Sequence, residues 1–268
     1  MKRNLIWVAS YPKSGNTWVR TILQSAITGS VNLTQLGDFI PSFPFCVSRL
    51  NRGKSIAHPS QASQYWPHAQ TTISTDAGNS SAIIKTHNVC AAFGGTMFPN
   101  PAATQSAIYI VRDPRDVAIS ASHHFDQDLS DSIELLMDEK NFIYKKQNYF
   151  RGEFISSWQT HVNSWMKAPF PVLLIRYEDL LSGPETFIEK IITFLEIDPK
   201  VPVKKIAAAT SFRNLSHLEQ QNGFSEKAHS VDFFRTGKAH QWAQDDPSFR
   251  PLVDTYSETL VKLGYEVT

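Results

Sequence analysis

The sequence has almost no net charge and very little cysteine. Its 268 residues hold 26 lysines and arginines against 25 aspartates and glutamates, a formal net charge of +1. This balance provides no basic surface for nucleic acid or an anionic membrane, so we expect neither as a partner. Two cysteines are too few for the disulfide framework of a secreted protein, and we expect both to be reduced thiols.

Long apolar runs and metal-ligand spacings are also missing. No segment approaches the roughly 18 apolar residues of a membrane span, and the run over residues 5–9 is too short for a signal peptide. The nine histidines show no pair spaced as in H-E-x-x-H. We therefore expect a cytoplasmic protein that needs no metal.

The apolar runs that are present predict an α/β fold. They are short, rich in β-branched residues and not alternating, as in parallel strands covered on both faces. Amphipathic patterns between them predict helices, so we expect a central parallel β-sheet flanked by helices in one domain over 1–268. The expected strands are 5–10, 81–86, 106–112 and 171–177. The expected helices are 16–27, 114–125, 153–167, 184–196 and 248–263.

Two segments interrupt this order. Residues 28–80 mix prolines with aromatic side chains and show little helical period, and residues 220–246 combine glycine, basic residues and phenylalanine. Long irregular insertions in a compact domain are usually functional. We expect both segments to be irregular and to wall or cover a binding site, although the aromatics of 28–80 fit a small satellite core equally well.

The stretch "YPKSGNTW", which follows the first expected strand, has the character of an anion-binding loop. A helix is expected to begin near Asn16, where its free N–H groups face a bound anion. Gly15 allows close backbone approach, Ser14 and Thr17 add hydroxyl donors, and Lys13 adds a positive charge. A Walker A loop has its lysine after the glycine, so this loop is P-loop-like but suits a different anion.

The stretch "IVRDPRDVAIS" predicts a second strand-to-helix junction. Asp113 and Pro114 form an N-cap and first-turn pair, and Asp116 completes a D-x-x-D capping pattern. Arg112 at the end of the strand and Ser120 in the helix can share a phosphate. From these residues alone, pairing of Arg112 with Asp113 or Asp116 remains an equal alternative.

A third candidate is the stretch "IIKTH". His87 follows a buried strand, at the strand end where α/β proteins place their sites, and Lys85 lies close by in sequence. A histidine in such a place can act as a general base. A purely structural role for a single histidine is the alternative.

Taken together, the three stretches resemble sulfotransferases that use 3′-phosphoadenosine 5′-phosphosulfate (PAPS). Further matches follow in the same order, and the resemblance runs from Leu5 to about Trp242. They are "IRYEDL" at 175–180, "TSF" at 210–212 and "FFRTGKAHQW" at 233–242. The resemblance implies sulfuryl transfer from PAPS to a hydroxyl or amine of a small-molecule acceptor, with 3′,5′-adenosine bisphosphate (PAP) as product and no metal.

The resemblance also implies the roles of individual residues. His87 takes the proton of the acceptor, while Lys13 and Lys85 stabilise charge on the transferring group. The other residues hold PAPS, and they fall into three groups. Lys13 to Thr17 bind the 5′-phosphosulfate; Trp18, Tyr177, Thr210 and Phe212 surround the adenine; Arg112, Ser120, Arg235, Thr236 and Gly237 surround the 3′-phosphate.

The sequence departs from the family in two places. The late loop commonly reads Arg-Lys-Gly, whereas here Thr236 stands in the place of the lysine. The short dimerisation motif of many animal cytosolic members has no counterpart after Trp242, so a dimer of that type is not expected. The first loop is more similar to bacterial members, including those that sulfate natural products.

Two other functions remain open. A P-loop kinase is one, with Asp113 ending a Walker B-like strand, although its lysine would be misplaced. A nucleotide-binding module without catalysis is the other, and Thr236 gives it slight support. Lys13, Lys85 and His87 together favour an enzyme, because a pure binder needs no base.

Overall fold

The structure of the chain, a computed structural model, describes residues 2–145, 148–227, 232–243 and 246–267. The chain divides into two compact units, and each is described here by itself. The first unit consists of Met1–Tyr11, Ile40–Tyr109 and Leu135–Leu174, and the second unit of Pro12–Phe39, Ile110–Glu134 and Ile175–Thr268. The extent of a single domain over 1–268 stays a prediction.

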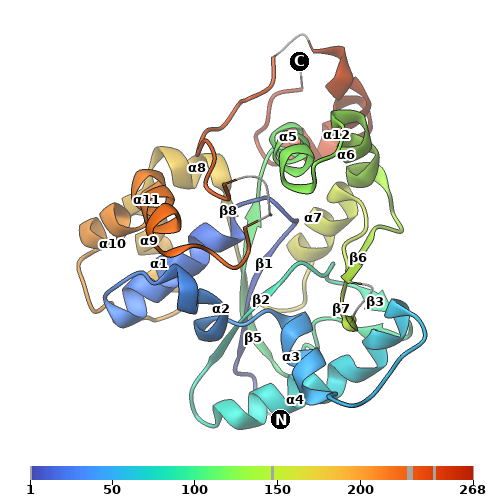
Figure 1. The fold of residues 1–268 in the computed structure, drawn as a ribbon, viewed down its shortest axis with the longest axis vertical. Helices are drawn as coiled ribbons and strands as arrows, with labels where there is room; N and C mark the ends of the chain where they lie inside the picture. The colour runs from blue at the N-terminus through green and yellow to red at the C-terminus, as the bar shows by residue number, and fades with distance from the viewer. Residues whose placement is uncertain (1, 146–147, 228–231, 244–245, 268) are drawn as a thin grey trace. The chain divides into compact units, whose positions relative to one another are not determined.

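The centre of the fold is a parallel sheet of four strands in the order β2-β1-β5-β8, flanked by helices (Figure 1). The expected α/β architecture is thereby confirmed. All six residues of β1 are buried, whereas β8 at the edge is partly exposed, as its outer position requires. The strands are β1 (Leu5–Ser10), β2 (Ala82–Thr86), β5 (Thr104–Val111) and β8 (Val172–Arg176).

The pairing of β1 with β2 positions the ends of both strands. Val8 aligns with Lys85 and Ala9 with Thr86 in parallel register. The chain therefore leaves both strands at the same edge of the sheet, into the loop after Ser10 and into His87. Two of the three sequence motifs begin there.

The first unit also holds helices and hairpins that correct two expectations. Residues 28–80 are not irregular, because prolines at the first helical positions begin helices there instead of breaking them. The helix expected over 153–167 begins only at residue 158, since 153–154 belong to a hairpin strand. The elements are α3 (Phe43–Leu50), η2 (Pro59–Tyr65), α4 (Trp66–Ala77), β3 (Ala92–Phe93), β4 (Thr96–Met97), β6 (Phe142–Lys145), β7 (Asn148–Phe154) and α7 (Trp158–Met166).

The second unit is mainly helical, and in it α1 packs against α10, with α9 and α11 beside them (Figure 1). Of the segment 220–246 that was expected to be irregular, residues 220–222 end a helix, and residues 223–227, 232–243 and 246 belong to no helix or strand. Residues 228–231 and 244–245 lie outside the described residues. The helices are α1 (Asn16–Thr28), η1 (Leu33–Gln35), α2 (Leu36–Phe39), α5 (Pro114–Phe125), α8 (Tyr177–Ser182), α9 (Pro184–Phe194), α10 (Val203–Ala209), α11 (Phe212–Asn222), η3 (Pro247–Phe249) and α12 (Arg250–Lys262). Helix α6 (Leu129–Met137) has residues in both units.

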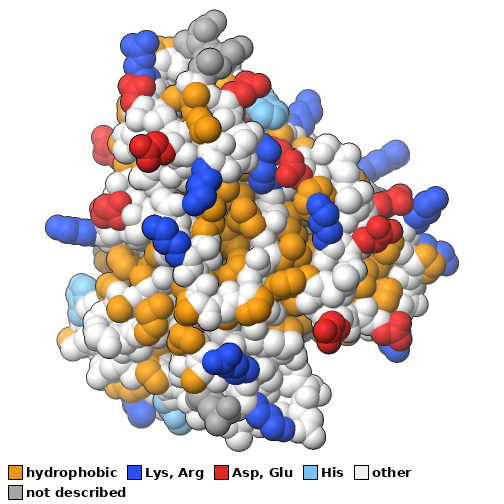
Figure 2. All heavy atoms as spheres, turned by 180° about the vertical axis from the view of Figure 1, so that it is seen from behind, with side chains coloured by type: hydrophobic (Ala, Val, Ile, Leu, Met, Phe, Trp, Pro, Cys, Tyr) orange, Lys and Arg blue, Asp and Glu red, His pale blue; other side chains and the backbone are white. Residues whose placement is uncertain are grey.

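Each unit has its own apolar core. In the first unit Trp7, Phe43 and Phe98 meet edge to face or tilted, with ring centres 5.0 to 5.4 Å apart. In the second unit Leu33, Leu36, Leu215, Phe224 and Phe234 form a buried cluster. Apolar side chains also reach the surface, with lysines and arginines among them (Figure 2).

Candidate functional site

The loop after β1 has the geometry of an anion cradle. Lys13 and Gly15 both take left-handed backbone angles, with φ of 67° and 101°. Gly15 is the N-cap of α1 and has no side chain that could cap the helix. The hydroxyl of Ser14 is fully buried and has no hydrogen-bond partner among the described residues. A buried hydroxyl in this state fits a ligand rich in anionic oxygens.

Arg112 holds this loop from the end of β5. Its guanidinium donates to the carbonyl oxygen of Lys13 at 3.3 Å and to that of Lys238 at 3.0 Å. It also lies over the ring of Tyr177, 4.3 Å from the ring centre, and 4.0 Å from the carboxylate of Asp116. The carboxylate of Asp113, the other alternative partner, accepts from the guanidinium of Arg115 at 2.9 and 2.7 Å.

Aromatic rings surround the loop within the second unit. The ring of Tyr177 meets that of Trp18 edge to face at 5.6 Å. A Cβ atom on residue 15 would come within 2.8 Å of the same tyrosine ring. Only glycine therefore allows the backbone to lie this close to Tyr177. Phe212 occupies the space where a side chain on Gly237 would lie, and the φ of 58° at Gly237 also favours glycine. Of the residues expected around the adenine, Trp18 and Tyr177 are therefore in contact.

Four other predicted donor-binding residues differ in their hydrogen bonds and in their burial. Thr17 donates its hydroxyl to Glu226 at 3.1 Å. Thr210 is buried and donates its hydroxyl to the carbonyl of Ile206 at 2.8 Å. Asn16 is buried and Ser120 is half-buried.

The late loop carries Arg235, Thr236 and Gly237. The side-chain carbonyl of Gln241 accepts from the guanidinium of Arg235 at 3.3 Å and from the hydroxyl of Thr236 at 3.0 Å. Gln241 therefore fixes two of the side chains that the resemblance implies at the 3′-phosphate. Every predicted donor-binding residue belongs to the second unit, and both His87 and Lys85 belong to the first.

His87 is held at the start of its loop by residue 10. Its Nδ1 lies 2.8 Å from the carbonyl oxygen of Ser10 and 3.3 Å from the hydroxyl of the same residue. A carbonyl oxygen can only accept, so Nδ1 carries the proton and Nε2 is the basic nitrogen. Ser10 precedes Lys13 by three residues in the chain. Lys85 is half-buried on β2, and its backbone N–H donates to Pro41.

Comparison with known proteins identifies the family. The sulfotransferase domain family matches residues 3–258. This chain belongs to that family. Among its relatives, flavonol 3-sulfotransferase of Flaveria bidentis is 27% identical over 89% of this chain and 75% of its own. Amine sulfotransferase of Oryctolagus cuniculus is 25% identical over 88% of this chain and 73% of its own.

A solved structure agrees on the fold. Mouse sulfotransferase SULT7A1, complexed with PAP, superimposes with a TM-score of 0.61 at 20% identity, covering 97% of this chain and 86% of its own. With family membership shown, the expectations of an enzyme and of PAPS as its sulfuryl donor are confirmed. The buried Ser14 hydroxyl suits an anionic group of the kind that PAPS carries.

Sequence reasoning missed the acidic residues that organise the sulfotransferase's late loop. Asp116 does not cap its own helix; it accepts from the backbone N–H groups of His240 and Gln241 at 2.8 and 2.9 Å. Glu219 accepts from those of Phe233 and Phe234 at 2.7 and 2.9 Å. Both carboxylates are buried. The only available signal was an acidic residue in an otherwise apolar helix face.

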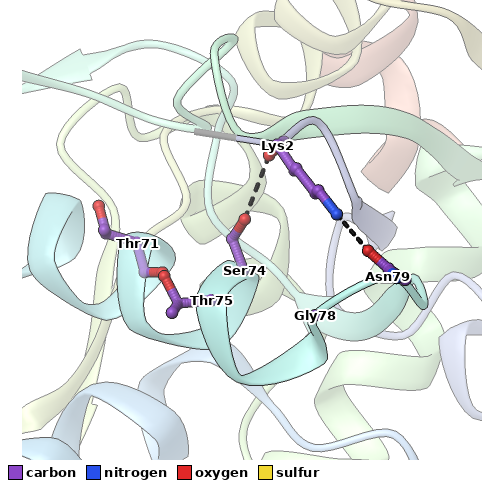
Figure 3. Close-up of a pocket in the computed structure, with 6 residues that line it drawn as sticks. All are labelled: Lys2, Thr71, Ser74, Thr75, Gly78 and Asn79. Carbon is purple, nitrogen blue, oxygen red and sulfur yellow. Dashed lines mark hydrogen bonds between the residues drawn. The ribbon is translucent and has the colours of Figure 1, made fainter.

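A pocket of about 660 Å³ in the first unit contains none of the predicted residues. Its wall consists of Lys2, Thr71, Ser74, Thr75, Gly78 and Asn79 (Figure 3). The ammonium of Lys2 is paired with Asn79, and Ser74 donates to the backbone of Lys2. These polar groups satisfy one another, so the pocket has no evident ligand chemistry.

Within the described residues, no group of three or more His, Cys, Asp or Glu side chains could hold a metal ion. In that same part of the chain, no helix is long and apolar enough to cross a bilayer.

Proposed function

We propose that this sulfotransferase transfers the sulfuryl group of PAPS to a hydroxyl or amine of a small-molecule acceptor, with His87 as the general base. The observation that carries the proposal is the bond from His87 Nδ1 to the carbonyl of Ser10. It fixes the tautomer in which Nε2 can accept the acceptor's proton. The named relatives include one for a flavonol and one for amines, which supports both kinds of acceptor group.

The proposed step balances without a metal. His87 Nε2 takes the proton from the acceptor O–H or N–H as the acceptor atom bonds to sulfur. The bond between sulfur and the bridging oxygen of PAPS breaks, and PAP leaves with that bond's electrons. Lys13 and Lys85 stabilise the developing charge, since such transfers depend mostly on positioning and electrostatics.

Donor binding is assigned to the second unit. Lys13, Ser14, Gly15, Asn16 and Thr17 would hold the 5′-phosphosulfate, which the buried Ser14 hydroxyl supports. Trp18, Tyr177 and Phe212 would pack around the adenine. Thr210 can only accept a hydrogen bond from a ligand, because its own hydrogen is donated to Ile206; the exocyclic amine of adenine is a donor of the required kind. Arg112, Ser120, Arg235, Thr236 and Gly237 would surround the 3′-phosphate.

The decisive experiment compares two histidine variants. His87→Ala should lower turnover with radiolabelled PAPS by about 10²–10⁴-fold, the usual contribution of a positioned base. PAP affinity should stay unchanged. His68→Ala, at an exposed position of α4, is the matched control and should keep full activity.

The assay needs a panel of acceptors with hydroxyl and amine groups, including glycans. Full turnover by the His87→Ala enzyme would contradict the proposal that His87 is the base. A thermal-shift comparison distinguishes the kinase alternative: a sulfotransferase should be stabilised by PAP in metal-free buffer, whereas a kinase should be stabilised by ATP once Mg²⁺ is added and not by PAP. Cytosolic names among the relatives support a cytoplasmic location.

A further inference from the structure

His161 on α7 is a buried histidine that donates to the backbone of His87. Its side chain is 0% exposed, and its Nε2 lies 3.1 Å from the carbonyl oxygen of His87. Because that oxygen can only accept, Nε2 must carry the proton. The contact joins residues separated by 74 positions in the sequence.

The other ring nitrogen of His161 also has a hydrogen-bond partner. Nδ1 lies 2.8 Å from the hydroxyl of Tyr109, which must donate to it once Nε2 is protonated. Tyr109 stacks on the imidazole at 5.6 Å, and Tyr11 meets it edge to face at 5.5 Å. Burial lowers the pKa of His161 to about 3, and burial also raises the pKa of Tyr109 well above its ordinary value. The proton arrangement therefore persists across the pH range in which enzymes work.

The peptide groups around His87 are fixed on their other sides too. The N–H of His87 donates to the carboxylate of Glu153 at 2.6 Å. Trp165, one helical turn after His161, donates its indole N–H to the carbonyl of Asn88 at 3.0 Å. With Ser10 on the imidazole, His87 has anchors on its N–H, its carbonyl and its ring.

We propose that His161 is a positioning residue for sulfuryl transfer, which holds the carbonyl of His87 and so sets where the basic Nε2 lies. This inference rests on the proposed function, in which His87 is the base. Loss of the donor leaves a carbonyl unsatisfied and allows residue 87 to shift. A displacement of about 1 Å can cost on the order of 100-fold in rate.

Two amide substitutions test the donor itself. In His161→Gln the amide nitrogen reaches the place of Nε2 and can still donate to His87. In His161→Asn the amide lies at the level of Nδ1, out of reach of that carbonyl. Both variants remove the ring, and thermal unfolding of each checks that the chain still folds at the assay temperature.

The expected result is a split between the two variants. His161→Asn should lower kcat at least tenfold, leave the KM for PAPS and the Kd for PAP within about twofold, and His161→Gln should recover most of the rate. Equal kcat in both variants, or a change in the KM for PAPS alone, would overturn the positioning role. His87→Ala is measured beside them. An active His87→Ala enzyme rejects the proposed base, whereas an inactive one with a fully active His161→Asn rejects only the positioning role.

Discussion

Lowering the pH from 7 to 5 should destabilise the first unit through His161. Burial lowers the pKa of this histidine from 6.5 to about 3 in the folded chain. Between these two values the unfolded chain binds a proton that the folded chain does not. The contribution of His161 to the free energy of unfolding is therefore fully present above pH 6.5 and falls as the pH drops toward 3. At 1.36 kcal/mol per pH unit, the contribution of His161 falls by about 2 kcal/mol by pH 5.

The measurement is urea unfolding of the wild-type chain and of His161→Gln at both pH values, followed by tryptophan fluorescence. Trp158 and Trp165 lie on the same helix as His161 and report on its unfolding. Carboxylates elsewhere titrate in both proteins, so the difference between the two proteins isolates His161. The wild-type chain should lose about 2 kcal/mol more than the variant between pH 7 and pH 5. Equal losses would refute the reasoning, because they would mean that the buried imidazole accepts a proton as easily as an unfolded one.

Two further predictions concern the second unit and the cysteines. Gly237→Ala should weaken PAP binding at least tenfold by calorimetry, because a side chain there would overlap Phe212. The control is Gly29→Ala, where φ is 85° and the nearest atom is 3.7 Å away. It should lower the free energy of unfolding by only about 1 kcal/mol and leave PAP affinity unchanged. Equal effects would exclude the overlap as the cause. Burial raises the pKa of Cys46 to about 11 and of Cys90 to about 12, so iodoacetamide at pH 8 should alkylate the folded thiols roughly 100-fold more slowly than the unfolded ones. Fast labelling of the folded chain would contradict this burial.

The sheet and the first loop could be predicted because both are encoded locally. The four strands of the sheet appear as short apolar runs, and the strand over 5–10 was predicted at its observed bounds. The prolines of 28–80 led to the wrong prediction of an irregular segment, because the effect of a proline depends on whether it falls inside a helix or at its first turn. The helix over 153–167 was extended too far because Glu153 and Phe154 pair across a hairpin with Phe142 and Ile143, a contact that periodicity does not report.

Supporting residues of the site were beyond sequence reasoning for a related reason. His161 and Glu153 act on His87 from 74 and 66 positions away, and Asp116 acts on the late loop from 124. Each is an ordinary residue of its own helix or strand until the fold brings its partner near. Both cysteines are free thiols, as expected from their number.

The partition of the chain between the two units has a consequence for its synthesis. The first unit is complete once Leu174 has been made, whereas the second unit needs the stretch from Ile175 onward. A chain that folds as it leaves the ribosome can therefore form the bonds that orient His87 first, since Ser10, Glu153 and His161 are already present. The hydrogen bonds of Thr17 to Glu226 and of Arg112 to Lys238 form only after those later residues have been synthesised. His87 can therefore receive its hydrogen bonds from the first unit before Glu226 and Lys238 have been synthesised.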